Sequence, residues 1–469
     1  MQPRAATPAT QYPQPTCGRL TRVALRILAA RPSKDLLSLP WQQPLEEWDF
    51  SVQVPLARGI SRHVVRFVRA DQQVYAVKET REEWAWREYQ LLRNLQRLGL
   101  PTVEPVGVVT GRTSPDGAEI EPALLTRHLQ HSLPYRALFS QQLQPDTVRR
   151  VVDALVVLLV RLHVEGFWWG DCSLSNTLFR RSAGEFAAYL VDAETGELHD
   201  SLSDGQRAHD LELVTTNAFG ELCDLQAGGL LDEDWEPFEM VDRIQRRYDE
   251  LWTALTGVEE FGTAETWRIE QRIAVLNELG FDIEELDIVT DWDGSSVRIR
   301  PAVVEAGHHR RRLQGLTGLD VEEQQARRLL NDLDAYTASH DLQGEDPTIV
   351  AHRWQTEVYE PVRAMVPPAL RERMEVAELF HEVLEHRWYL SEKAGQEVDF
   401  FDAARDYVDN VLPRRSDLVP DGNVRSVAAL ATAIEAEAAG AGERGVGAMM
   451  DSDADANSDD GAPGDLGWL

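Results

Sequence analysis

A helix, a polar turn and a short strand in direct succession constrain the fold more than any other part of the chain. The amphipathic run Val148–Leu162 predicts a helix that stops at Gly166. Asp171 follows in a turn of small residues, and Asn176 stands directly before Thr177–Phe179, which has the pattern of a short strand. The turn therefore presents a carboxylate and an amide next to buried structure.

A second carboxylate follows another predicted strand. Tyr189–Val191 is a short apolar segment that ends at Asp192, sixteen residues beyond Asn176. Phosphoryl transfer uses such a set, because one carboxylate accepts the proton of the attacking hydroxyl and two further groups hold Mg²⁺ against the phosphates. Asp171, Asn176 and Asp192 are therefore the candidates for these three roles.

A small β-sheet is predicted ahead of this region. Its expected strands are Val52–Val54, His63–Val68, Val74–Lys78, Val103–Val109 and Ile120–Thr126. The turn around Gly59, between the first two strands, could lie over nucleotide phosphates. Most hairpins with a single glycine have no such role, so both interpretations stay open at this point.

A lysine at a strand end and a glutamate on the next helix form a predicted ion pair. Lys78 ends its strand, and Trp84–Leu98 carries an apolar stripe of helical period. Glu88 lies beside that stripe, so it can reach Lys78 and fix the ammonium against the α- and β-phosphates. Glu82 and Glu83, in the first turn, would only complement the helix dipole. The alternative is a solvated strand-end lysine.

These residues occur in a known order. Leu162–Gly166, followed by Gly170–Asp171 and Asn176, resembles the catalytic loop of the protein-kinase-like fold in its small-molecule-kinase form, Leu-His-x-x-Gly and then His-Gly-Asp-x-x-x-x-Asn. Trp169 departs from this form, which has histidine there. The resemblance covers roughly residues 50–225 and is to lipopolysaccharide-core (Kdo) kinase relatives. The whole chain resembles an uncharacterised actinobacterial family that joins such a domain to a C-terminal domain of unknown function.

The resemblance implies an α+β fold. We expect a bilobal protein-kinase-like domain, with a small antiparallel sheet lobe and a helical lobe, followed by a mostly α-helical C-terminal domain. ATP and Mg²⁺ are the implied cofactors. The residues carried over are, for nucleotide and metal, Lys78, Gly59, Asn176 and Asp192, and, for catalysis, Asp171, Lys78 and Glu88.

Other polar residues nearby are expected to support the site. Glu194 would assist Asp192, since related kinases often have a second acid there. His163 belongs to the helix end and is expected to be structural. Asp210 either accepts backbone N–H bonds from the catalytic loop, as the resemblance implies, or simply caps its own helix. Asp146 is the expected N-cap of the helix that leads into the loop.

Composition along the chain divides it into segments. These are a disordered extension at 1–18, a sheet lobe with its lead-in at 19–130, a helical lobe at 131–285, a mostly helical domain of unknown function at 286–412, and a disordered acidic tail at 433–469. Asp232–Gly280 is helical in pattern, and Asp287–Arg300 predicts a hairpin. His308–Arg312 is the only basic concentration, and it either binds an anion or pairs with acidic neighbours.

The overall charge limits the partners of this chain. Lys and Arg number 47 against 79 Asp and Glu, a formal net charge of −32, which argues against nucleic acid. No apolar run reaches the length of about 18 residues that a membrane span needs. Three cysteines lack metal-like spacing, and the N-terminus has no apolar signal-peptide segment. We therefore expect a soluble, cytoplasmic protein.

The pattern is compatible with more than one function. The first is an ATP- and Mg²⁺-dependent phosphotransferase with a nucleotide and an unidentified hydroxyl acceptor as partners. Because no Ala-Pro-Glu peptide-substrate signature follows Asp192, a small-molecule, sugar or lipid-linked hydroxyl is favoured. The alternative is a catalytically weak nucleotide-binding pseudokinase whose C-terminal domain binds a protein partner, which Trp169 and the poor glycine loop favour. A third possibility is an enzyme of the same fold that transfers another group of the nucleotide, such as AMP, in place of a phosphoryl group.

Overall fold

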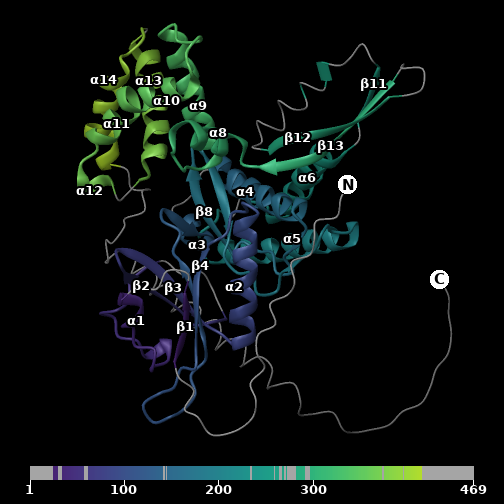
Figure 1. The fold of residues 1–469 in the computed structure, drawn as a ribbon, viewed down its shortest axis with the longest axis vertical. Coiled ribbons are helices and arrows are strands. Elements are labelled where there is room, and N and C mark those ends of the chain that lie inside the picture. Colours follow the sequence, from purple (N-terminus) through teal and green to yellow (C-terminus); the bar gives the residue numbers. More distant parts are fainter. Residues whose placement is uncertain are drawn as a thin grey trace, which may run out of the picture.

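The computed structural model arranges the chain as a sheet lobe, a helical lobe, a long β-ribbon and a C-terminal group of helices (Figure 1). It describes residues 25–29, 34–56, 62–140, 143, 145–232, 235–257, 259–262, 267–268, 271, 281–290, 296–371, 374–394 and 396–414. The predicted α+β fold, with a small antiparallel sheet lobe ahead of helical regions, is confirmed.

A five-stranded antiparallel sheet forms the first lobe, in the order β1–β4–β5–β3–β2. The strands are β1 Arg26–Ala29, β2 Val65–Ala70, β3 Gln73–Glu79, β4 Glu104–Thr110 and β5 Ala123–Arg127. Helix α2, Glu82–Arg97, packs on the sheet, where its Tyr89 contacts Val108 and Leu124. The helix therefore packs on β4 and β5, next to β3, which carries Lys78.

The predicted strand Val52–Val54 is wrong. This segment makes a single β-bridge to the sheet, between Gln53 and Val68, with a hydrogen bond from the Val54 amide to the Phe67 carbonyl, while the Val52 and Gln53 amides bond back to Asp49 and Phe50. Pro55 follows and offers no N–H, so the pairing cannot continue as a ladder.

The lead-in to the sheet lobe is more ordered than its prolines indicate. It contains two short helices, α1 Lys34–Leu37 and η1 Leu45–Glu47. Its tryptophans pack onto the lobe: Trp41 and Trp48 are only 2% and 3% exposed and lie in one apolar core with Val77 of β3. Burial of these large rings holds the lead-in against the sheet.

The second lobe is built around a long buried helix. Its helices are α3 Tyr135–Phe139, α4 Pro145–Val164, α5 Asp204–Ala227 and α6 Pro237–Thr256. Its strands are β6 Ser132–Pro134, β8 Thr177–Ser182 and β9 Glu185–Leu190, in the order β6–β8–β9, and the pair β7 Phe167–Trp168 with β10 Glu197–Leu198. Because α4 already begins at Pro145, Asp146 lies in its first turn, and its prediction as the N-cap is wrong.

A three-stranded ribbon follows α6. Its strands are β11 Glu259–Gly262, β12 Phe281–Thr290 and β13 Ser296–Ala306, in the order β11–β13–β12. The pairing of β12 with β13 confirms the predicted hairpin, although its Asp-Gly turn lies outside the described residues. The helical prediction for 232–280 is wrong at β11, because α6 ends before Gly257 and the chain then becomes extended.

Residues 308–414 form a group of helices that we call the C-terminal helical domain. Its elements are α8 His308–Thr317, α9 Glu323–Ser339, α10 Pro347–Trp354, η3 Gln355–Tyr359, α11 Glu360–Met365, α12 Pro368–Arg371, α13 Val376–Ala394, α14 Phe400–Asp406, η4 Tyr407–Val411 and η5 Leu412–Arg414. Trp354, Phe380 and Tyr407 lie in its own apolar core. Among the described residues, no helix combines the length and apolarity that a membrane crossing requires.

Candidate active site

A buried aspartate on α5 holds the backbone of the polar turn that follows α4. Gly166, with φ +80°, ends the helical run, and β7 leads into the turn. Asp210 of α5 is fully buried and accepts the backbone N–H groups of Trp169 at 2.6 Å and Gly170 at 2.8 Å. The role implied for Asp210 by the resemblance is confirmed. The alternative, an N-cap, is wrong, because Ser203 caps α5.

His163 and Glu221 complete the support of this turn. The His163 ring lies between Asp210, at 3.2 Å, and the Tyr248 hydroxyl, at 2.7 Å, so its expected structural role is confirmed. Glu221 of α5 accepts the backbone amides of Leu174 and Ser175 at 2.9 and 2.8 Å. Nothing in the sequence separated Glu221 from the other acids of a helix, so sequence reasoning missed it.

Trp169 keeps a hydrogen-bonding role at the position where the resembled loop has histidine. Its side chain is fully buried, and the indole Nε1–H donates to the Asp192 carbonyl oxygen at 3.0 Å. The Thr195 hydroxyl in turn donates to the Trp169 carbonyl at 2.9 Å. Trp169 therefore ties the polar turn to the segment that carries Asp192.

Asp171 and Asn176 face each other across the turn. The Asn176 side-chain amide donates from Nδ2 to the Asp171 carbonyl oxygen at 2.8 Å and to its carboxylate Oδ2 at 3.1 Å. With both Nδ2 hydrogens used, the Oδ1 atom of Asn176 is the one left to bind a cation. The Asp171 carboxylate remains 41% exposed, so a substrate hydroxyl can reach it.

Lys78 is the centre of a second group of charges. Its ammonium lies 3.0 Å from Glu88 Oε2, 2.8 Å from Asp192 Oδ2 and 3.1 Å from Glu194 Oε2. The structure thus brings β3, α2 and the segment after β9 together, and Glu88, not the exposed Glu82 or Glu83, reaches the lysine.

The pKa values of this group follow from its burial. One ammonium cannot neutralise three carboxylates, and burial, reinforced by the Asp192 charge, raises the pKa of Glu88 to about 8. Burial alone would disfavour the ammonium, but the carboxylates of Glu88, Asp192 and Glu194 outweigh it and raise the pKa of Lys78. Lys78 therefore stays charged, and the site carries excess negative charge that suits a cation.

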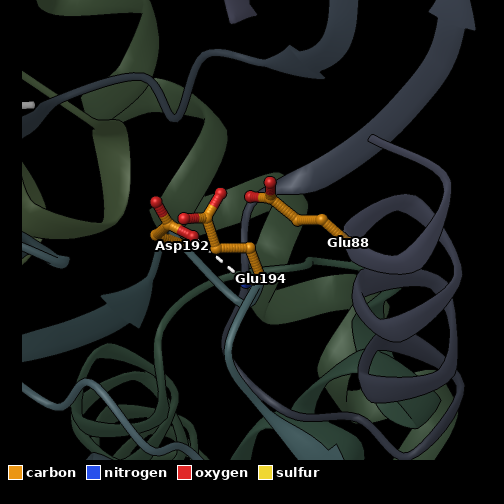
Figure 2. Close-up of side chains that lie close together, drawn as sticks. All are labelled: Glu88, Asp192 and Glu194. Atoms are coloured by element: carbon orange, nitrogen blue, oxygen red, sulfur yellow. Dashed lines mark hydrogen bonds between the residues drawn. The ribbon is translucent and has the colours of Figure 1, made fainter. Parts of the chain in front are cut away.

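Figure 2 shows the three carboxylates side by side. One oxygen from each of Glu88, Asp192 and Glu194 lies within 4.8 Å of the others. Carboxylate and amide oxygens are the hard donors that Mg²⁺ prefers, so Asp192 with Glu194 beside it could hold a magnesium ion, and the Val191 amide joins the Asn176 backbone to the same segment. The Glu194 amide donates to Asp192 Oδ1 at 3.1 Å and helps to orient that carboxylate.

Sequence reasoning missed Arg62 and His63 as part of the site, and Arg62 joins the two groups. Arg62 Nη2 lies 3.5 Å from Asp171 Oδ2 and 3.1 Å from Glu194 Oε1, and His63 Nε2 lies 3.2 Å from Glu194 Oε2. Both residues stand just beyond Gly59, which lies outside the described residues. Their place directly after the expected phosphate loop was the signal that could have identified them.

The basic segment at the start of the C-terminal helical domain is paired with acids. His309 contacts Glu323 at 2.8 Å, Arg310 contacts Asp320 at 2.7 Å, and Arg312 lies 3.8 Å from Asp334. The pairing interpretation of this cluster is therefore confirmed for these residues, and they are not part of the site around Lys78.

Two stretches of the chain match known protein families. Residues 64–240 match the lipopolysaccharide kinase (Kdo/WaaP) family. This kinase-family segment contains Lys78, Glu88, Asp171, Asn176 and Asp192 in the expected order, and the predicted resemblance is confirmed. Residues 250–412 match DUF4032, a domain of unknown function, which confirms the second part of that resemblance.

One solved structure, "WaaP in complex with acyl carrier protein", is similar to this chain at 20% sequence identity. The similarity covers 54% of this chain and 99% of that chain, with a TM-score of 0.33. The comparison with curated proteins gave no match.

Proposed function

We propose that this chain is an ATP- and Mg²⁺-dependent phosphotransferase that acts on a hydroxyl of a small-molecule, sugar or lipid-linked acceptor. The observation that carries the proposal is the position of Lys78. Its Nζ atom lies 3.0 Å from Glu88 Oε2 on α2 and 2.8 Å from Asp192 Oδ2. A kinase nucleotide site likewise pairs a strand lysine with a helix glutamate next to a metal-binding aspartate. The match to a lipopolysaccharide kinase family supports a sugar-bearing acceptor.

Each residue has a distinct part in the proposed reaction. Lys78 binds the α- and β-phosphates. Asn176 Oδ1 and Asp192 would hold Mg²⁺, which would supply positive charge against the phosphate oxygens. Asp171 accepts the proton of the acceptor hydroxyl as the oxygen attacks the γ-phosphorus. The bond from the γ-phosphorus to the bridging oxygen breaks, and ADP leaves. The chain contributes positioning and charge rather than a covalent intermediate.

Arg62 supplies a cation where the glycine loop is poor. Its guanidinium bridges Asp171 and Glu194, so it lies between the proposed base and the proposed metal side. A transferring phosphoryl group carries negative charge on its three equatorial oxygens and passes between those two sides. Arg62 is placed to exchange its carboxylate partners for these oxygens when nucleotide binds.

A nucleotide-binding regulator with little activity is the second candidate. The observation that favours it is Trp169, a large buried ring in place of a histidine. The polar set around Asp171 and Lys78 remains complete despite this ring, and the indole supports Asp192 by a hydrogen bond. We therefore favour the enzyme.

Metal-dependent nucleotide binding tests the proposal. We expect wild type to bind ATP more tightly with Mg²⁺ than without it, and Asp192→Asn to lose most of that gain, about 10-fold or more in Kd, as loss of an oxygen ligand predicts. Titration calorimetry measures both constants. Glu82→Gln, an exposed acid at the start of α2, is the matched control and should behave as wild type. Equal ATP affinity with and without Mg²⁺ in wild type would refute the proposed function.

A further inference from the structure

The hairpin β8–β9 sets the distance between the two proposed metal ligands. At its open end Thr177 pairs with Leu190, Asn176 precedes the first strand, and Asp192 follows the second by two residues. The Val191 amide donates to the Asn176 carbonyl oxygen at 3.1 Å and closes this end. Any element that fixes the hairpin therefore acts on the metal side of the site.

The two faces of the hairpin meet different parts of the molecule. Phe179 and Ala188 are paired partners whose side chains lie in the apolar core of the helical lobe. Alternation along the strands turns Arg180 and Tyr189 to the opposite face. There they meet the C-terminal helical domain, which Figure 1 places directly above β8.

Acids at the starts of two helices hold this outer face. Glu322, the N-cap of α9, lies 3.1 Å from Arg180 Nη1 and accepts the Tyr189 hydroxyl at 2.5 Å. Glu375, directly before α13, pairs with the same arginine. The Glu322 and Arg180 side chains are only 8% and 15% exposed, so their ion pair is largely buried, and loss of Glu322 would leave Arg180 with Glu375 as its acidic partner.

The closed end of the hairpin is held by α13. The Ala183 amide donates to Glu378 Oε2 at 2.7 Å, and Gln325 of α9 donates to the same carboxylate at 3.0 Å. Gly184, with φ +83°, packs so closely that a Cβ would lie 3.2 Å from His381 Nε2. Negative charge at the N-termini of α9 and α13 also complements their helix dipoles, which stabilises these contacts.

We propose that the C-terminal helical domain is a positioning module for the site, which holds the β8–β9 hairpin so that Asn176 and Asp192 keep the separation required for one metal–nucleotide complex. Arg180 and Glu322 are its central positioning residues. The inference rests on the proposed function for its chemical meaning. It gives the DUF4032 segment a role inside the chain rather than toward a separate partner.

Hydrogen exchange in the full chain tests the mechanical part without any ligand. Glu322→Gln removes the charge that Arg180 and Tyr189 share, and we expect the amides of Thr177 and Val191 to exchange about 10-fold faster, while those of α6 stay unchanged. Glu360→Gln, which breaks an exposed pair with Arg363 in the same domain, is the control.

Two results would overturn the positioning role. Faster exchange confined to residues 180–189, or an equal effect in the Glu360→Gln control, would show that the contacts do not reach the site. Should Glu322→Gln fail to fold, Tyr189→Phe removes one hydrogen bond to the same carboxylate without stranding a charge, and the same exchange pattern is expected at smaller size.

Metal dependence of nucleotide binding tests the chemical part. Glu322→Gln should raise the Mg²⁺ concentration needed for half-maximal ATP binding by about 10-fold, as loss of an outer support of metal ligands does, and leave adenosine affinity unchanged. Equal weakening of ATP and adenosine would contradict positioning. A wild-type chain that binds no ATP would refute the proposed function instead, and the exchange result would still decide whether the hairpin is held.

Discussion

At the scale of residues, the site is a chain of charges whose members depend on one another. Lys78 is satisfied by Glu88, Asp192 and Glu194, and Arg62 connects Glu194 to Asp171. Without nucleotide, the Lys78 ammonium and the Arg62 guanidinium are both paired with carboxylates. Phosphate oxygens would replace those acids as partners, and Mg²⁺ would take over the carboxylate of Asp192.

Arg62 gives the residue-scale prediction. Arg62→Ala should weaken Mg²⁺–ATP binding by about 10-fold and leave ADP binding nearly unchanged, because a charge-assisted hydrogen bond to the γ-phosphate contributes about 1.5–3 kcal/mol. Arg62→Lys should recover part of the loss. Arg149→Ala, which removes an exposed pair with Asp146 on α4, is the control. A similar loss for ATP and ADP, measured by calorimetry, would contradict contact with the γ-phosphate.

At the scale of elements, each loop of the site is fastened to a neighbouring helix or strand. Asp210 and Glu221 of α5 hold the backbone of the polar turn around Asp171, and Trp169 links that turn to Asp192. The sheet lobe is fastened similarly where β5 ends. There the His128 ring packs edge-on against Phe67 of β2, with ring centroids 5.4 Å apart.

His128 makes the stability of this junction pH-dependent. Burial, with the nearby His131 adding to it, lowers the pKa of His128 to about 4 in the folded chain, against an unfolded value of about 6.5. The unfolded state therefore binds the extra proton first, and the free energy of unfolding should fall as pH drops from about 6.5 to about 4, by at most about 1.4 kcal/mol per pH unit from this group. Urea unfolding at several pH values measures the slope. His128→Asn should reduce the slope, and an unchanged slope would show that His128 is not held neutral.

At the scale of the whole molecule, two family segments share one polar interface. The kinase-family segment contributes Arg180 and Tyr189, and the DUF4032 segment contributes Glu322, Glu375 and Glu378. The helical lobe and the C-terminal helical domain have separate apolar cores, and these charges and hydrogen bonds connect them. A polar interface of this kind fixes one relative orientation, which a positioning role requires.

Local patterns in the sequence predicted much of this architecture. Helical period placed α2 and α4, and short apolar segments placed β3 and β8, because these elements bury part of their surface in a core. The predicted strand Tyr189–Val191 overlaps only the last two residues of β9, Glu185–Leu190. Proximity of Lys78 to Glu88 followed from the same reasoning, and the structure brings the two together. The roles of the site residues in catalysis and metal binding stay predictions.

Contacts between distant segments could not be predicted from the sequence. Arg62 reaches Asp171 across the site, and Glu322 reaches Arg180 across the domain interface, and neither pair leaves a periodic signal in the chain. The strand prediction for Val52–Val54 was wrong for a local reason. The alternation of apolar residues indicated a strand, but the proline that follows has no N–H to continue the pairing. The basic segment around Arg310 resembled a binding site only because its acidic partners are far along the chain or on another helix.

The measurement that tests the central claim most directly is single-turnover release of ADP from Mg²⁺–ATP, with water as the acceptor, in wild type and in Asp171→Asn. The account predicts slow, Mg²⁺-dependent turnover in wild type. It predicts a loss of about 100-fold or more in Asp171→Asn with nearly unchanged ATP affinity, because the amide cannot accept the proton but fits the same space. Turnover that is equal in the two proteins would contradict the assignment of Asp171 as the base and, with it, the proposed phosphotransfer site.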